Sequence, residues 1–265
     1  MLGLEPKSPQ ALDMFWYDGQ LIEARQLHLD IADPGLCYGA SCFTTMRVYD
    51  GCLNHPLTSW QSHCDRLHRT LTAFGWHHPD WQRLEQGARL MIDFPVLRMT
   101  VFSDGREWIT GRSLPTDLKH RQTSGITAWL AREPLYRRSI PQHKTGNYLA
   151  AYLARNRASE LEAGEAILLD SEGNWLETST GNLWGWSKGC WYTPNLAAGI
   201  LPGIARSRWL DFLARRQIKV RENIWTPEFC LTLEAIGYSN CVVDFIPIIA
   251  VLDRDQKTIY SLKQP

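Results

Sequence analysis

The clearest hydrophobic pattern in the chain lies between Thr58 and Gly75. Apolar residues recur there at helical spacing, namely Trp60, Cys64, Leu67, Leu71 and Phe74. This spacing predicts an amphipathic helix, with Thr58 and Gln61 as a capping box and Gly75 as its end. A polar row of His63, Arg66 and Thr70 follows the margin of the stripe. Such a row is usually a solvated flank, although an arginine there can also bind a phosphate.

Shorter apolar or alternating runs bounded by turn residues predict strands. Residues 14–29 predict two strands joined by an Asp18-Gly19 turn, and residues 43–49 predict a strand that ends in a hairpin turn at Asp50-Gly51. Further strands are predicted over 96–102, 126–130, 165–170, 175–178, 182–186, 190–193 and 235–248. Helices are predicted over 148–162 and within 194–216, where Pro202 occupies the first turn.

Residues 110–124 show no periodicity and are rich in polar residues, glycine and proline. This composition predicts a linker, so we expect a small domain over 1–118 and a large one over 119–265. Neither predicted domain contains an internal repeat.

Composition excludes several classes of partner. Lys plus Arg equals Asp plus Glu at 28 each in 265 residues, so no net charge attracts nucleic acid or an acidic membrane. We find no long apolar run at the amino terminus and expect a cytoplasmic protein. The seven cysteines include no CxxC pair, which favours reduced thiols and no metal site.

The candidate chemistry begins with Lys144, which lies between a proline-broken segment and an alanine-rich helical run. A lysine at such a boundary can present its amine to a cleft and form a Schiff base with a carbonyl. Glu177 on a predicted strand, the helix start near Gly203, and Arg66 supply a carboxylate, backbone amides and a guanidinium. Together these are the groups that pyridoxal 5′-phosphate (PLP) requires, although each alone is commonly a surface residue or an ordinary helix start.

The order of motifs resembles the fold-type IV PLP enzymes, the class IV aminotransferase family. The matching segments are Leu36-Cys-Tyr-Gly39, Cys42-Phe-Thr-Thr-Met-Arg-Val48, Ser62-His-Cys-Asp-Arg-Leu67, His143-Lys-Thr-Gly-Asn147, Ala166-Ile-Leu-Leu-Asp-Ser-Glu-Gly173, Glu177-Thr-Ser-Thr-Gly-Asn-Leu183, Tyr192-Thr-Pro194 and Gly199-Ile-Leu-Pro-Gly-Ile-Ala-Arg206. The resemblance implies an α/β (α+β) fold with a small amino-terminal domain and a larger pseudo-barrel domain. It also implies a homodimer with PLP between the domains and a small-molecule substrate.

The resemblance further implies a role for each matching residue. Lys144 is the Schiff-base lysine and proton carrier, and Glu177 pairs with the pyridine nitrogen. The phosphate is held by Arg66, by the loop amides of Gly203, Ile204 and Ala205, and by Ser239 and Asn240. Ala205 departs from the threonine that aminotransferases often carry, so its contact would be through the backbone. Tyr148 resembles a tyrosine that meets the ring hydroxyl, with a spacing one residue shorter.

The segment Cys42-Phe-Thr-Thr45 indicates the reaction. Aminotransferases of the family commonly read Phe-Glu-Thr or Phe-Glu-Ser here, whereas aminodeoxychorismate lyases resemble Phe-Thr-Thr. We therefore expect a lyase that forms 4-aminobenzoate and pyruvate, with Thr44 as general acid. Arg98 and Arg106 are candidates for the substrate carboxylates. The alternatives are transamination of branched-chain or D-amino acids, which uses the same lysine and carboxylate, and a non-catalytic cofactor-binding protein.

Overall fold

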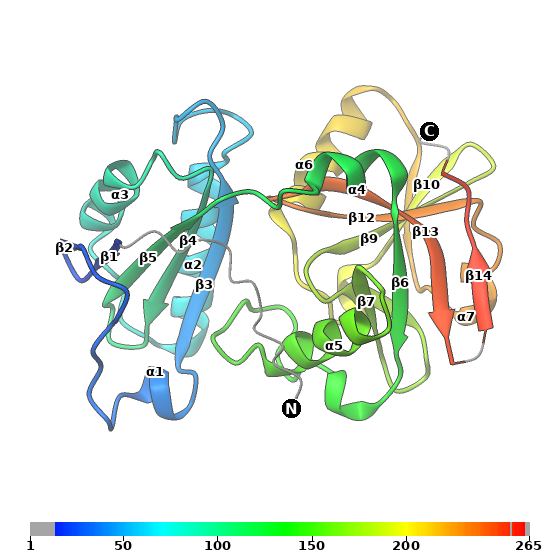
Figure 1. Cartoon of the computed structure of the whole chain (residues 1–265). Coiled ribbons are helices and arrows are strands. Elements are labelled where there is room, and N and C mark those ends of the chain that lie inside the picture. The colour runs from blue at the N-terminus through cyan, green and yellow to red at the C-terminus, as the bar shows by residue number, and fades with distance from the viewer. Residues whose placement is uncertain (1–13, 255, 263–265) are drawn as a thin grey trace. The chain divides into compact units, whose positions relative to one another are not determined.

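The computed structural model describes residues 14–254 and 256–262 (Figure 1). The chain divides into two compact units. Unit 1 contains residues 1–115 and 144–147, and unit 2 contains 116–143 and 148–265. The segment that carries Lys144 therefore belongs to unit 1, although the residues on both sides of it belong to unit 2.

Unit 1 is an antiparallel sheet with two long helices. Its strands are β1 (Phe15–Tyr17), β2 (Gln20–Ile22), β3 (Ser41–Arg47), β4 (Val96–Phe102) and β5 (Glu107–Arg112), in the order β2-β1-β5-β4-β3. Its helices are α1 (Pro34–Cys37), α2 (Trp60–Phe74) and α3 (Trp81–Leu90). Leu67 and Leu71 of α2 are buried with Met46 of β3 and Met99 of β4 in one core. This packing fixes α2 along β3, which is an edge strand of the sheet.

The local patterns of unit 1 were largely predicted. Asp18 and Gly19 form the turn between β1 and β2 with φ of 45° and 86°, which confirms the hairpin. Gly75 ends α2 with φ of 64° in the left-handed region, as expected for a helix stop. Asp50 and Gly51 form the expected hairpin turn with φ of 52° and 58°, closed by one antiparallel bridge between Tyr49 and Cys52.

The start and the polar row of α2 differ from the prediction. Ser59 is the N-cap, and Thr58 instead donates its hydroxyl to the carbonyl of Cys52, so the capping box is wrong. His63, Arg66 and Thr70 are 0%, 7% and 3% exposed, so this row is not a solvated flank. His63 and Arg66 contact Thr44 of β3, and the spacing along α2 cannot reveal this contact.

Unit 2 is a larger sheet covered by helices. Its strands are β6 (Ile126–Ala131), β7 (Glu165–Leu169), β8 (Trp175–Thr178), β9 (Asn182–Ser187), β10 (Cys190–Pro194), β11 (Val220–Asn223), β12 (Ala235–Asn240), β13 (Asp244–Asp253) and β14 (Gln256–Ile259). They run in the order β11-β10-β9-β12-β13-β6-β7-β8, with β14 on β13. Glu177 of β8 pairs with Asn182 of β9, and this pairing closes the sheet into a pseudo-barrel. The two-part α/β fold is thereby confirmed.

The helices of unit 2 are α4 (Leu118–Ser124), α5 (Leu149–Glu160), α6 (Ile204–Arg215) and α7 (Pro227–Cys230), with 3-10 turns η1 (Pro134–Tyr136) and η2 (Leu196–Ala198). The predicted linker over 110–124 is wrong at both ends, because β5 runs to Arg112 and α4 begins at Leu118. Pro202 precedes the N-cap of α6, Gly203, and does not lie in the first turn.

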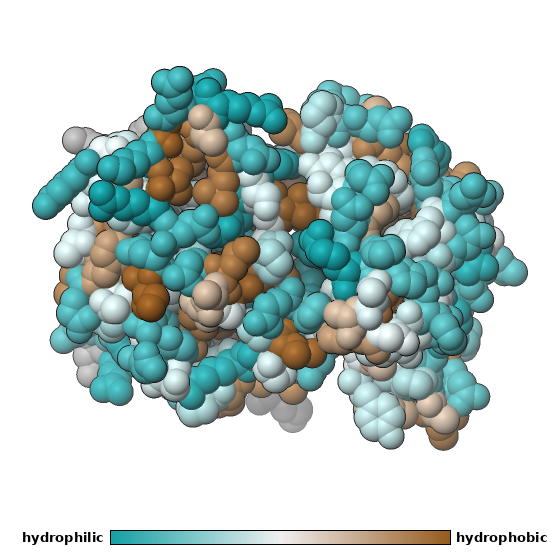
Figure 2. Space-filling view, turned by 180° about the vertical axis from the view of Figure 1, so that it is seen from behind, coloured by the Kyte–Doolittle hydropathy of each residue, from teal (hydrophilic) through white to brown (hydrophobic). Residues whose placement is uncertain are grey.

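Hydrophilic residues cover much of the face shown in Figure 2, with apolar residues in separate patches. Among residues 14–254 and 256–262, no helix is long and apolar enough to cross a membrane.

Candidate active site

The candidate residues of unit 1 lie on opposite faces of β3. Side chains alternate along a strand, and Cys42 and Met46 point into the core beneath α2. Thr44 lies between them and shares that face, where it is 0% exposed. Phe43 and Thr45 therefore point to the opposite face.

Thr44 contacts two side chains of α2. Its Oγ1 lies 2.5 Å from Nδ1 of His63 and accepts a hydrogen bond from the Arg66 guanidinium. Because arginine has no acceptor, the Thr44 oxygen must be the acceptor in that bond. The structure thus brings Thr44 and Arg66 together. The general-acid role of Thr44 stays a prediction, since its hydroxyl is engaged on the core face.

Lys144 lies beside the other face of β3. The segment pairs with the free edge of the strand, where the amide of Phe43 donates to the Lys144 carbonyl at 2.8 Å and Cys42 bridges Thr145. In this antiparallel register Lys144 lies opposite Phe43, and its Nζ is 4.6 Å from the Phe43 ring centroid. The half-buried amine therefore lies on the face that Thr44 does not share.

The two candidate arginines for the substrate have different surroundings. Arg98 lies on the face of Phe43, with its Cζ 3.7 Å from that ring centroid, so the structure brings it to the lysine's side of β3. Arg106 instead forms an ion pair with Asp33 at 2.5 Å and donates to Asp104 and Tyr17. Its donors hold the loops of unit 1 together, and its substrate role stays a prediction.

Glu177 is the central carboxylate of unit 2. It is 5% exposed, and its Oε2 accepts from the Leu201 amide at 3.1 Å and from Nδ2 of Asn182 at 3.4 Å. Oε1 accepts from Arg138 at 2.5 Å. Several donors, one of them a cation, favour the ionised carboxylate in this buried position.

Arg138 was not singled out by the sequence analysis, although it precedes Lys144 by only a few residues. Besides Glu177 it donates to the carbonyl of His143 at 2.7 Å, and its Cζ lies 5.1 Å from the ring centroid of Tyr148. Burial, followed by the Arg138 charge, lowers the pKa of His143, which keeps that imidazole neutral at pH 7. Arg138 thus ties the residues on both sides of the lysine segment to the carboxylate.

The start of α6 is joined to Glu177 through Asn182. Besides Glu177, Nδ2 of Asn182 reaches the Leu201 carbonyl at 2.9 Å, and a Cβ built on Gly203 would lie 2.0 Å from Asn182 Oδ1. Only glycine fits this approach of backbone to side chain. Among the described residues no side chain caps α6, which leaves its first amides for another acceptor, and their contact with phosphate stays a prediction.

The last predicted phosphate segment also lies at this end of α6. Cys241 packs against Ile204 and Ala205 in a small buried cluster. Ser239, 1% exposed, accepts from the Trp184 indole at 2.9 Å. Asn240 accepts from the amides at 242 and 243, at 2.9 and 3.0 Å, so it also forms the turn between β12 and β13. The structure brings these residues to the helix start, while their contact with phosphate stays a prediction.

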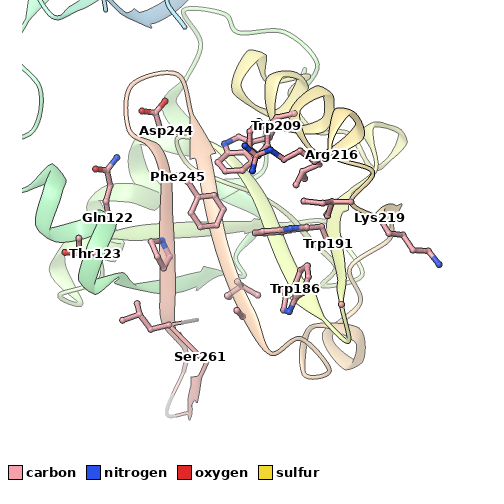
Figure 3. A pocket seen from close by; sticks show the side chains of 18 of the residues that line it. Gln122, Thr123, Trp186, Trp191, Trp209, Arg216, Lys219, Asp244, Phe245 and Ser261 are labelled. Carbon is pink, nitrogen blue, oxygen red and sulfur yellow. The ribbon is translucent and has the colours of Figure 1, made fainter. Parts of the chain in front are cut away.

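None of these residues lines the wide cavity of unit 2. It has a volume of about 920 Å³ and includes Trp186, Trp191, Trp209 and Phe245 in its lining (Figure 3). A smaller cavity of about 240 Å³ adjoins the Arg138–Glu177 pair. Among the described residues, no cluster of His, Cys, Asp or Glu has the arrangement of a metal site.

A sequence model of the family described as amino-transferase class IV matches residues 41–251. The chain belongs to this family. Members depend on PLP, which confirms the predicted cofactor and that the protein is a PLP-dependent enzyme. The matched range includes Thr44, Arg66, Lys144, Glu177 and the start of α6.

The relatives divide between two activities. The chain is 22% identical over 275 residues to an aminodeoxychorismate lyase of Vibrio harveyi, covering 94% of this chain and 95% of the relative. It is 24% identical to a branched-chain-amino-acid aminotransferase of Pseudomonas aeruginosa, covering 91% and 85%. Its fold matches a crystal structure of the branched-chain amino acid aminotransferase of Escherichia coli with a TM-score of 0.80 at 21% identity, covering 96% and 90%.

Proposed function

We propose that this class IV enzyme is a PLP-dependent aminodeoxychorismate lyase, which releases pyruvate and forms 4-aminobenzoate, a folate precursor. The observation that carries the proposal is a neutral hydroxyl at Thr44, within the Phe-Thr-Thr segment that resembles the lyases, where aminotransferases commonly carry glutamate. The similarity to the Vibrio harveyi lyase along nearly the full length of both chains supports it.

The residues present fit PLP. Glu177 is a buried carboxylate with charged and neutral donors around it, and it suits a protonated pyridine nitrogen. Arg66 and the uncapped amides at residues 204 and 205 suit the phosphate. Lys144 has a half-buried amine, and its backbone pairs with the edge strand β3. Such a position suits covalent attachment of the cofactor. Lys144 would anchor the cofactor and Glu177 would hold the proton at the ring nitrogen.

PLP, when bound, supplies an electron sink for the substrate carbon that bears nitrogen. The protein contributes proton transfer and orientation. Lys144 would remove the proton from that carbon, a role that needs a nearby neutral amine. Arg98, on the same face of β3, would orient a substrate carboxylate through its fork of donors.

Transamination of branched-chain or D-amino acids is the second candidate. The similarity to the branched-chain-amino-acid aminotransferase of Pseudomonas aeruginosa supports it, and the same lysine and carboxylate serve it. Both reactions begin with the same proton removal, so their assays must differ in product.

Paired assays test the proposal. The purified protein is supplied with chorismate, glutamine and the partner synthase, and 4-aminobenzoate is measured. In parallel, L-leucine or D-alanine is added, and conversion of the bound cofactor to its pyridoxamine form is followed by absorbance. We expect 4-aminobenzoate in the first assay. Turnover only in the second would replace the lyase by a transaminase.

We also propose that the enzyme works as a cytoplasmic homodimer, as the resemblance to its family implies. Light scattering of the purified holoenzyme should give twice the mass of the chain, and a monomer mass would contradict this assignment. Cell fractionation tests the compartment.

A further inference from the structure

We propose that the adjacent threonines of β3 serve different ligands. Thr44 positions Arg66 for the cofactor phosphate, whereas Thr45, together with Arg98, binds a carboxylate of the substrate. The inference rests on the proposed function in taking Arg66 as a phosphate ligand and Lys144 as the reacting amine. It replaces the general-acid role predicted for Thr44.

The hydrogen bonds of Thr44 argue for a positioning role. A hydroxyl has two acceptor positions and one donor. Arg66 occupies one acceptor position, and His63 Nδ1 at 2.5 Å takes a second position as donor or acceptor. All three side chains are at most 7% exposed. The Thr44 oxygen therefore holds one N–H of a guanidinium that has five, and so fixes the direction of the others.

Thr45 has the opposite environment. It pairs with Arg98 across β3 and β4, so the two side chains stand beside each other on the face that carries Phe43. Its side chain is partly exposed, and within residues 14–254 and 256–262 its hydroxyl has no hydrogen-bond partner. A hydroxyl donor beside a guanidinium is a suitable pair for a carboxylate.

The ring of Phe43 lies close to both Arg98 and the amine of Lys144. Arg98 Cζ and Lys144 Nζ lie 3.7 and 4.6 Å from the centroid of the same ring. A substrate whose amine reaches Lys144 can therefore place a carboxylate at Arg98 and Thr45. Both candidate reactions use an amine that also carries a carboxylate, so this assignment holds for either one.

Two isosteric variants separate the roles. Thr44→Val and Thr45→Val each exchange a hydroxyl for a methyl group. Apoenzyme is titrated with PLP by absorbance, and kcat and KM are then measured at saturating PLP with whichever substrate gives turnover. We expect Thr44→Val to weaken PLP binding about 10-fold. Thr45→Val should raise KM about 10-fold and leave PLP affinity unchanged.

Controls keep the outcome interpretable. Thr44→Ser retains the hydroxyl and should retain PLP affinity. If Thr44→Val does not fold, Thr44→Ala removes the same hydroxyl without the second methyl group. A loss of kcat in Thr44→Val at unchanged PLP affinity would restore its general-acid role and overturn the inference, as would an unchanged KM in Thr45→Val. The PLP titration needs no turnover, so failure of the lyase assignment is distinguishable from failure of this one.

Discussion

Arg138 and Glu177 form an ion pair at 2.5 Å, with side chains only 9% and 6% exposed. The arginine also holds the carbonyl that precedes Lys144, and the carboxylate also holds the Leu201 amide close to α6. This pair therefore links the loop before the lysine to the strand that closes the pseudo-barrel. Breaking it should affect both the stability of unit 2 and the binding of the cofactor.

Arg138→Met should destabilise the cofactor-free protein by about 3 kcal/mol, because it leaves a buried carboxylate without its cation. Denaturant unfolding of the apoenzyme measures the change. Arg137→Met is the matched control, since this neighbouring arginine is exposed and should change stability by less than about 0.5 kcal/mol. A double-mutant cycle with Glu177→Gln isolates the pair, and additive effects of the two substitutions would show that they are not coupled.

Glu177→Gln should retain bound PLP and lose activity by about 100-fold, because a neutral amide cannot hold the ring nitrogen protonated. Absorbance spectra establish cofactor content, and steady-state rates measure the loss. Glu165→Gln serves as control, because Glu165 on β7 is another buried carboxylate but bonds to the hydroxyls of Ser179 and Thr180. Full activity of Glu177→Gln would remove this carboxylate from the mechanism.

Lys144→Ala should abolish turnover and the absorbance of covalently bound cofactor, since no other amine is assigned to this attachment. Borohydride reduction of the parent holoenzyme, followed by peptide mass spectrometry, should locate the phosphopyridoxyl group on Lys144. Lys219→Ala, at an exposed lysine, should behave as the parent. A label on a different lysine would refute the attachment site.

Arg106→Met should lower stability near neutral pH, make stability less dependent on acid and leave KM nearly unchanged. Burial raises the pKa of Asp33, but the bond from Arg106 and those from nearby amides outweigh it, so the net pKa is lowered. A lowered carboxyl pKa stabilises the fold above the unfolded value of about 4, and this contribution is lost as pH falls through the folded value. Without Arg106 the folded pKa of Asp33 rises towards the unfolded value, so this acid-dependent loss of stability should become smaller. Thermal unfolding between about pH 3 and pH 7 measures it, and a raised KM with an unchanged pH profile would instead support substrate binding.

Much of the fold follows from local patterns. The Asp18-Gly19 turn, the stop of α2 at Gly75 and the strands around Glu177 depend on neighbouring residues and on side-chain periodicity. The order of motifs around Lys144 and Gly203 likewise indicated a PLP enzyme. The predicted start of α2 was wrong because the hydroxyl of Thr58 donates a hydrogen bond to the carbonyl of Cys52, which lies outside the helix.

The arrangement of the candidate site depended on contacts between distant segments. Strand alternation told us that Thr44 and Thr45 face apart, but only the packing of α2 on β3 showed which of them meets Arg66. The burial of His63 and the Arg138–Glu177 ion pair likewise result from contacts between segments that are distant in the sequence. Residue types and spacing determine which groups a chain carries and which local elements it forms, whereas the partner of a buried polar group is set by whichever strand or helix folds against it.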